Sequence, residues 1–167
     1  MKIISVIGLG GQGISLLGRL LGYAATLDGR YASVHSSYGA EVRGGRVESK
    51  IAIHDKDIIN PYVSGADIYI VLHKIGWELT NISSIEGVEI YADKDLCGDR
   101  LSDRHIIHIP FSKISLEEDI PLNMLVLGFV AKKVGISLES IYKALEDWGL
   151  TREKNVLALK RGFELKI

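Results

Sequence analysis

A glycine turn between an apolar run and a helical pattern constrains the fold of this chain more than any other feature. Gly8, Gly10 and Gly13 match the pattern G-x-G-x-x-G. They directly follow the apolar run 3–7 and precede residues 14–27, whose apolar side chains recur at helical spacing. Glycine permits positive φ and close approach, and such a turn directs the first N–H groups of a helix at a phosphate. The pattern predicts a strand, a turn and a helix that either bind a nucleotide-linked ligand or simply pack closely together.

The rest of the chain alternates between strand patterns and helical patterns. Strand patterns occupy residues 31–35, 46–54, 68–72, 88–92 and 106–109. Helical patterns occupy residues 122–134, 138–148 and 152–165, with stop signals at Gly135 and Gly149. The strand 46–54 alternates in polarity and is expected near an edge, whereas 68–72 is expected to be buried on both faces. We expect an α/β, Rossmann-like fold in a single domain over 1–167, with a mainly parallel sheet covered by helices and a helical C-terminal third.

Composition and charge exclude several classes of function. Among the 167 residues, 47% are hydrophobic and 25% are charged, which is enough apolar surface for one packed domain. No run approaches the roughly 18 apolar residues of a membrane span. The net charge of -1 and the dispersed Lys and Arg residues offer no basic surface for nucleic acid or a membrane. The apolar start ends in glycines and lacks a cleavage site, so a first strand explains it better than a secretion signal, and we expect a cytoplasmic protein.

A second glycine-rich segment, residues 36–45, follows the second strand. Its polar sequence SSYGAEVRGG predicts a loop, the place where a ligand site is expected. Arg43 is suited to binding a phosphate or carboxylate through two N–H groups, or to pairing with Glu41 or a partner subunit. Glu41 is more typical of a solvated or paired carboxylate than of a proton carrier, and no catalytic residue is assigned. The candidate ligand-binding residues of both segments are Gly8, Gly10, Gly11, Gln12, Gly13, Ser36, Ser37, Tyr38, Gly39, Arg43, Gly44 and Gly45.

Two missing side chains narrow the choice of nucleotide. No lysine follows Gly13 to reach β- and γ-phosphates, which argues against hydrolysis of ATP or GTP. NAD needs a carboxylate near the end of the second strand, where residues 33–35 have none, since Asp28 comes too early and Glu41 too late. We therefore expect NAD to bind weakly or not at all. Both glycine-rich segments follow strands expected to be parallel neighbours, so they should converge into one site.

The cysteine and the histidines do not predict a metal centre. Cys97 is the sole cysteine, so the chain can neither close an internal disulfide nor supply the four thiolates of an iron–sulfur cluster. We expect Cys97 to be a small, partly buried structural residue. His105 and His108 lie three apart on a predicted strand, which places their side chains on opposite faces. His35, beside the serine-containing loop, is predicted either to contact a ligand or to be neutral and hydrogen-bonded.

Taken together, the two glycine-rich segments resemble the gamma subunits of 2-oxoacid:ferredoxin oxidoreductases. The resemblance covers most of the chain and is carried by Gly8-Leu9-Gly10-Gly11-Gln12-Gly13, by Ser37-Tyr38-Gly39-Ala40-Glu41-Val42-Arg43-Gly44-Gly45, and by Ala66-Asp67, Asn123, Leu127-Gly128 and 155–162. It implies an enzyme that oxidatively decarboxylates a 2-oxoacid on thiamine diphosphate and transfers the acyl group to coenzyme A. Two electrons would then pass through iron–sulfur clusters to ferredoxin.

The resemblance assigns this chain a role outside the catalytic core. It implies that thiamine diphosphate, magnesium and the clusters lie in alpha, beta and delta partner subunits, whereas this chain supports assembly and contacts coenzyme A. Tyr38 with Gly44-Gly45 resembles the 2-oxoglutarate and branched-chain types more than the pyruvate type. Two other functions stay open: a free nucleotide-dependent oxidoreductase, and a structural or regulatory Rossmann-like domain.

Overall fold

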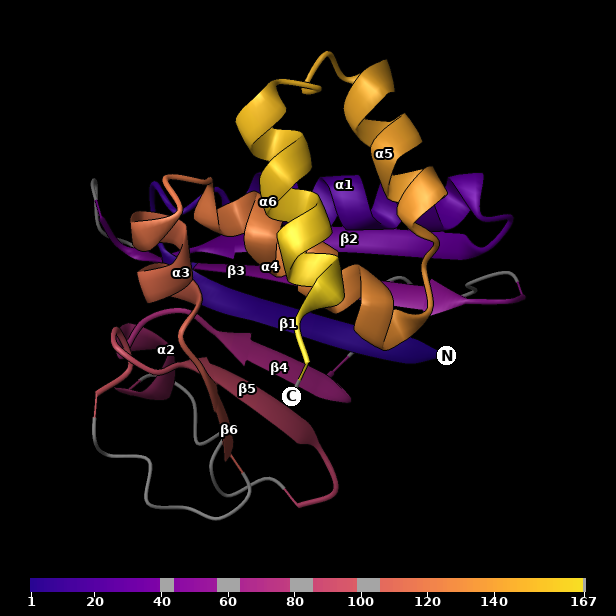
Figure 1. Ribbon diagram of the computed structural model, residues 1–167. Coiled ribbons are helices and arrows are strands. Elements are labelled where there is room, and N and C mark those ends of the chain that lie inside the picture. Colours follow the sequence, from indigo (N-terminus) through magenta and orange to yellow (C-terminus); the bar gives the residue numbers. More distant parts are fainter. Residues whose placement is uncertain (40–43, 57–63, 79–85, 99–105, 167) are drawn as a thin grey trace.

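The computed structural model describes residues 1–39, 44–56, 64–78, 86–98 and 106–166, which build a six-stranded sheet flanked by helices (Figure 1). The strand order is β2-β3-β1-β4-β5-β6. The strands are β1 (Lys2–Leu9), β2 (Tyr31–Tyr38), β3 (Arg46–His54), β4 (Ile68–Val71), β5 (Glu89–Asp93) and β6 (Ile106–Ile109). The helices are α1 (Ile14–Leu27), α2 (Ile75–Glu78), α3 (Phe111–Glu117), α4 (Leu122–Val134), α5 (Leu138–Asp147) and α6 (Glu153–Glu164).

The sheet is mainly parallel, as predicted, but one strand reverses. β1, β4, β5 and β6 pair in parallel, whereas β3 is antiparallel to both β1 and β2. β2 therefore points the same way as β1 but is separated from it by β3. The expectation that these two strands are neighbours was wrong. The connection 39–45 between β2 and β3 is too short for a crossover, which needs a dozen or more residues, so the chain must turn back on itself.

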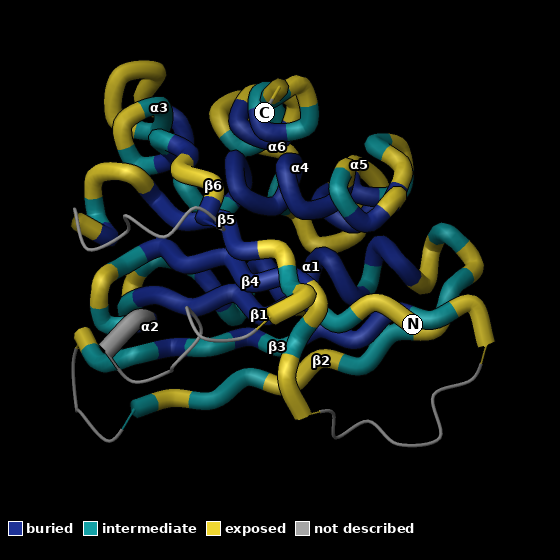
Figure 2. Tube along the Cα trace, turned by 90° about the horizontal axis from the view of Figure 1, so that it is seen from below, coloured by how far each residue is buried: buried dark blue, intermediate teal, exposed yellow. Residues whose placement is uncertain are grey.

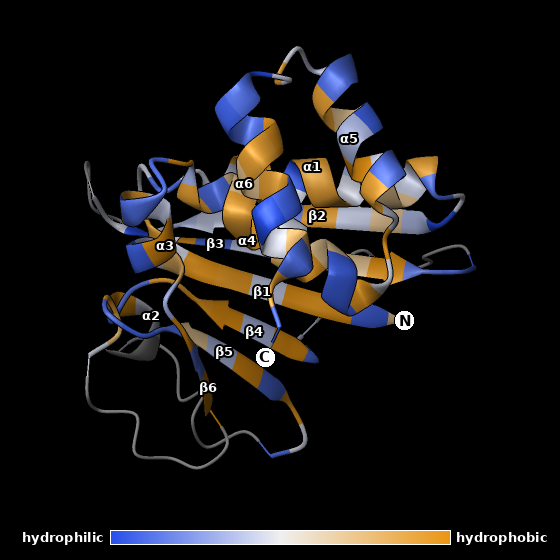
Figure 3. Ribbon diagram, in the orientation of Figure 1, coloured by the Kyte–Doolittle hydropathy of each residue, from blue (hydrophilic) through white to orange (hydrophobic). Residues whose placement is uncertain are grey.

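The helical C-terminal third is confirmed, and it forms two layers over the sheet. α1 and α4 lie on one face of the sheet, and α5 and α6 lie outside them (Figure 1). α4 is buried along nearly its whole length. α5 and α6 each have an apolar side that is buried and a polar side that is exposed (Figure 3). Gly135 ends α4 with a left-handed φ of 71°, which confirms the stop signal.

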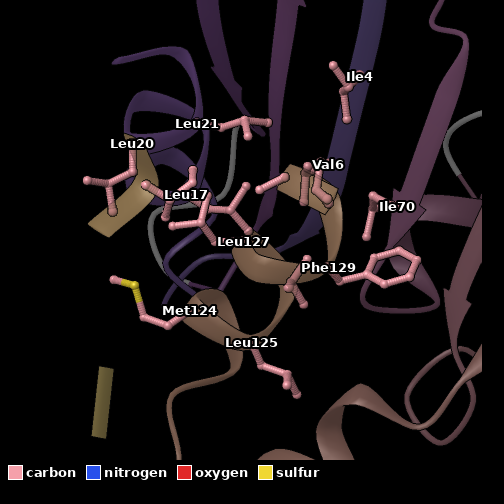
Figure 4. Close-up of a cluster of buried hydrophobic side chains, with 14 of the residues drawn as sticks. Ile4, Val6, Leu17, Leu20, Leu21, Ile70, Met124, Leu125, Leu127 and Phe129 are labelled. Atoms are coloured by element: carbon pink, nitrogen blue, oxygen red, sulfur yellow. The ribbon is translucent and has the colours of Figure 1, made fainter. Parts of the chain in front are cut away.

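The main hydrophobic core fills the space between the sheet and the helices α1 and α4. Ile4 and Val6 of β1 face Leu17 of α1 and Leu127 of α4 (Figure 4). The ring of Phe129 makes edge-to-face contacts with Tyr91 and Phe111, at centroid distances of 5.1 and 5.2 Å. These residues come from both ends of the sequence. The core therefore joins the first strand to the C-terminal helices.

The other face of the sheet divides into an apolar half and a polar half. A second apolar cluster lies on the β4 to β6 side, and Gly76 of α2 packs there against Ile7 and Val71. Cys97 belongs to this cluster, is 3% exposed, and donates through its thiol to the carbonyl of Val71. On the β2 and β3 side this face carries Glu48 and other polar residues. None of the helices in the described residues is long and apolar enough to span a membrane.

Two helical glycines set the distance between α4 and α6. A Cβ added at Gly128 would overlap the carbonyl oxygen of Leu159, and one at Gly162 would overlap the carbonyl oxygen of Leu125. The backbones of the two helices therefore touch directly. Glycine destabilises a helix interior by about 1 kcal/mol relative to alanine. Its presence at both crossing points indicates that the close approach of the two helices outweighs this cost.

A polar contact ties the end of α1 to the start of α5. Asp28 accepts hydrogen bonds from the N–H and hydroxyl of Ser137, at 3.1 and 2.9 Å, and from the hydroxyl of Ser140 at 2.6 Å. Partial burial raises the pKa of Asp28, but the hydrogen bonds from Ser140 and Ser137 outweigh it and hold the pKa below its usual value. Asp28 is thus engaged in the fold, far from the end of β2.

Candidate functional site

The two glycine-rich segments meet at one edge of the sheet, as the sequence predicts. The N–H of Gly10 donates a 2.9 Å hydrogen bond to the carbonyl of Gly45. The hydroxyl of Ser15, in the first turn of α1, lies 2.9 Å from the hydroxyl of Tyr38 at the end of β2. Because β1 and β2 point the same way, both segments leave the sheet at the same edge although β3 lies between the strands. The predicted convergence is confirmed.

The side chain of Gln12 closes the first glycine turn. Its Oε1 accepts a 2.6 Å hydrogen bond from the N–H of Leu9, and its Nε2 donates to the carbonyl of Leu72 at 3.3 Å. These bonds tie the end of β1 to the residue that follows β4. Both ends of the Gln12 amide thus have partners inside the protein, so Gln12 contributes to a ligand site chiefly by fixing the shape of the turn.

The glycines of the turn serve two different purposes. A Cβ at Gly8 would overlap the Gln12 amide, and one at Gly13 would lie 2.8 Å from Cγ of Asn123 at the start of α4. Gly8 and Gly13 are therefore needed for packing. Gly11 has a φ of 97° and open space around its Cα, and Gly10 is exposed. These two glycines leave the backbone accessible from solvent.

The N-terminus of α1 lies beside these accessible glycines. Its N-cap is Gly13, with a φ of 72°, and no side chain among the described residues caps it. The N–H groups of the first turn therefore have no capping side chain among the described residues and carry the positive end of the helix dipole, an arrangement that favours an anion. Asn123 brings the start of α4, which also lacks a side-chain cap among the described residues, next to this turn. Sequence reasoning missed Ser15 as a site residue and noted Asn123 only as part of the resemblance.

The end of β2 corrects the predicted start of the second segment. Ser36, Ser37 and Tyr38 were expected in a loop but continue β2 and pair with β3. The hydroxyl of Ser36 donates to the hydroxyl of Ser49 at 3.3 Å. Polar residues suit this position because β2 lies at the edge of the sheet and is mostly exposed or half-buried (Figure 2). The loop therefore begins at Gly39.

The central part of the second segment, residues 40–43, lies outside the described residues and includes the predicted Glu41 and Arg43. Gly39 and the pair Gly44-Gly45 flank this part, and Gly44 has a φ of 68°. Arg46, which follows, was not singled out in the sequence. Its Nη2 lies 2.6 Å from Oε2 of Glu48, and its Nε is buried without a hydrogen-bond partner among the described residues.

Two of the three histidines considered in the sequence lie in the described residues, on strands at opposite ends of the sheet. His35 lies in β2 opposite Lys50 of β3, on the face of the sheet that α1 does not cover. His108 lies on β6 and is exposed. His105 lies outside the described residues, so the predicted geometry of the two C-terminal histidines stays a prediction.

NAD binding is expected to be weak because the end of β2 carries no carboxylate. Ser36 to Tyr38 are uncharged, and Asp28 is held by Ser137 and Ser140 at the other end of α1. Titration calorimetry with NAD should give a dissociation constant of about 1 mM or weaker. A submicromolar constant would contradict this prediction and favour a free nucleotide-dependent oxidoreductase.

Comparison with known proteins places this arrangement in a family. The family model described as pyruvate ferredoxin/flavodoxin oxidoreductase matches residues 3–165. The 2-oxoglutarate synthase subunit KorC of Methanocaldococcus jannaschii is 37% identical over 174 residues, which cover 98% of this chain and 93% of KorC. The gamma subunit of a keto/oxoacid ferredoxin oxidoreductase from Geobacter sulfurreducens superimposes with a TM-score of 0.77 at 26% identity, covering 98% of this chain and 97% of that one.

A larger protein contains the same fold. The 2-oxoglutarate:ferredoxin oxidoreductase from Magnetococcus marinus, solved with 2-oxoglutarate, coenzyme A and succinyl-CoA bound, superimposes with a TM-score of 0.84 at 22% identity. The match covers 98% of this chain and 31% of that longer chain. At this level of identity the match concerns the fold alone.

Proposed function

The chain belongs to the pyruvate ferredoxin/flavodoxin oxidoreductase family as a gamma-type subunit, and from this premise we propose that its complex converts 2-oxoglutarate to succinyl-CoA and that its two glycine-rich segments bind the phosphate-bearing part of coenzyme A. The similarity to KorC over 98% of the chain supports 2-oxoglutarate as the substrate. The uncapped N-terminus of α1 beside the second glycine-rich segment is the observation that carries the coenzyme A site.

The chemistry of this edge fits a phosphate. Backbone N–H groups in the first turn of α1 donate hydrogen bonds without the desolvation cost of a buried cation, and the helix dipole adds attraction. The hydroxyl of Ser15 and the amide of Asn123 lie within the same neighbourhood. Arg43, from the second glycine-rich segment, would add a charge-assisted contact to the same phosphate.

The remaining chemistry belongs to partner subunits. We propose that alpha, beta and delta-type partners hold thiamine diphosphate with magnesium, and the iron–sulfur clusters that pass two electrons to ferredoxin. Cys97 is the one cysteine in this chain, and its buried thiol donates to a backbone carbonyl, so it cannot supply the thiolates of a cluster. The role of this chain is to orient coenzyme A toward the acyl group and to attach to the catalytic partners.

Replacing Arg43 tests the coenzyme A site. Arg43→Ala in the assembled complex should raise the KM for coenzyme A about tenfold or more, because losing a charge-assisted contact costs about 1.5–3 kcal/mol. The KM for 2-oxoglutarate and the kcat at saturating coenzyme A should change little. The measurement is the initial rate of viologen reduction as a function of coenzyme A concentration.

Lys50→Ala provides the matched control for this experiment. It also removes one cation, but from β3 on the face that α1 does not cover, so the KM for coenzyme A should stay within about twofold of the wild-type value. A normal coenzyme A dependence in an intact Arg43→Ala complex would remove the proposed contact. It would favour a structural role for the glycine turn, which the packing of Gly8 and Gly13 also fits.

A further inference from the structure

Among the described residues, no strand pairs with the outer edge of β2. β2 is the last strand of the sheet on this side and pairs with β3 without interruption from Tyr31 to Tyr38. The N–H of Gly39 donates to the carbonyl of Arg46, which fixes the pattern of the ladder. Because antiparallel pairs alternate, odd-numbered residues of β2 bond to β3 and even-numbered residues point their N–H and C=O groups outward. The outward-pointing residues are Ala32, Val34, Ser36 and Tyr38.

This edge lacks the features that normally block strand pairing. Its sequence, YASVHSSY, contains no Lys, Arg, Asp, Glu or Pro, and its register with β3 shows no bulge. Tyr31 and Tyr38 are 49% and 69% exposed, and Val34 is also exposed. Figure 2 shows β2 lying open along one side of the molecule. A long, uncharged and exposed edge of this kind is a template for another strand.

We propose that β2 pairs with β2 of a second copy of this chain, antiparallel about a twofold axis that passes between the two His35 residues. In this register Ala32 lies opposite Tyr38 of the second copy, and Val34 lies opposite Ser36. All four outward-pointing residues then exchange hydrogen bonds, and the two sheets become continuous.

Shifted registers satisfy fewer backbone groups. A shift by one residue places residues whose backbone groups point outward opposite residues whose backbone groups point toward β3. The two β2 strands then cannot form a ladder of hydrogen bonds. A shift toward the start of the strand pairs Tyr38 with Arg30, whose N–H is already donated to the carbonyl of Ala25. The register centred on His35 is therefore the one that pairs the described edge fully.

Side-chain sizes in this register are complementary. Tyr38 faces Ala32 of the second copy on one side of the sheet, and Tyr31 faces Gly39 of the second copy on the other. Each exposed tyrosine thus meets a small residue, either an alanine of the strand or the glycine that follows it. The pair formed by Ser33 and Ser37 is polar and uncharged, and β2 contains no Lys, Arg, Asp or Glu, so this register brings none of these charged side chains of the two strands together. This match to itself favours a second copy over a strand of unrelated sequence.

A disulfide across the axis tests the register. The two copies of residue 35 form a non-hydrogen-bonded pair with a Cα to Cα distance of about 4.5 Å, within the range of a disulfide. His35→Cys, in the full chain with its partner subunits present, should form a covalent dimer under mild oxidation. Ser33→Cys is the matched control, since the two copies of residue 33 would lie about 14 Å apart and should stay unlinked. The wild-type chain, whose buried Cys97 is 3% exposed, gives the background.

A substitution that blocks only the outer edge tests the association itself. Val34→Pro removes an N–H that points away from β3, so it should leave the β2 to β3 ladder intact while converting dimers to monomers in sedimentation velocity. Val34→Thr keeps the N–H and the β-branched shape and should remain dimeric. A monomeric wild-type chain that also fails to cross-link through His35→Cys would overturn the proposal. So would cross-linking of His35→Cys to a different polypeptide, which would assign the edge to a partner subunit.

Discussion

The purified chain, assayed alone with a 2-oxoacid, coenzyme A and a viologen dye, should reduce no dye. Two-electron oxidation needs a cofactor that stabilises the decarboxylated intermediate and a cluster that accepts the electrons. The chain has one cysteine, which is buried, whereas a cluster usually takes four thiolates. Enzymes of this kind exceed the uncatalysed rate by about 10⁶-fold or more, so the expected loss relative to the complex is of that order.

The matching positive result is activity of the reconstituted complex. Adding the partner subunits to the same preparation should restore coenzyme A-dependent dye reduction, with 2-oxoglutarate preferred to pyruvate and to branched-chain 2-oxoacids. Turnover by the chain alone would contradict its assignment as a subunit. Restored activity with a preference for pyruvate would contradict the proposed substrate and leave the subunit role intact.

Gly162→Ala should lower the free energy of unfolding by about 2 kcal/mol. The added methyl group would overlap the carbonyl oxygen of Leu125 and approach the backbone nitrogen of Phe129 to 3.0 Å, so the two helices must move apart. Overpacking of this kind costs about 1–3 kcal/mol and sometimes more, and the helix propensity of alanine returns about 1 kcal/mol. For a chain of this size the thermal midpoint should fall by about 4–8 °C, measured by circular dichroism.

Lys160→Ala on the same helix separates overpacking from a general sensitivity of α6. Lys160 is exposed, so its replacement should change the free energy of unfolding by no more than about 0.5 kcal/mol. If Gly162→Ala proved as stable as the wild type, α4 and α6 would not be held in the close contact described for Gly128 and Gly162.

The elements that the sequence predicts best are those with one strong signal. The turn after β1 shows its glycines in order, and the C-terminal helices have a clear helical period that ends at Gly135 and Gly149. The order of the strands was harder because the register of β2 and β3 depends on tertiary pairing. The short connection 39–45 did carry a usable signal, since a crossover between parallel strands does not fit into it.

The meeting of the two glycine-rich segments was predictable from the sequence, but its details were not. Glycine allows both close packing and ligand approach, so the pattern alone could not separate the packing role of Gly8 and Gly13 from the exposure of Gly10 and Gly11. The inward turn of Gln12 depends on where β4 ends, which is a long-range feature. Ser36 to Tyr38 resembled a loop because an edge strand that is only partly covered needs no strong hydrophobic alternation.

The burial of α4 against β1 also bears on how the chain folds while it is being synthesised. Ile4 and Val6 leave the ribosome early, whereas their partners Leu127 and Phe129 follow more than a hundred residues later. At about 5–20 residues per second this interval lasts about 6–25 seconds. During that time α1 can form locally and β1 can pair with β3 and β4, but the face that α4 will cover stays open to water and to other nascent chains. Contacts between such distant parts of the sequence also slow the final folding step, because the closing of a long loop precedes the gain from burial.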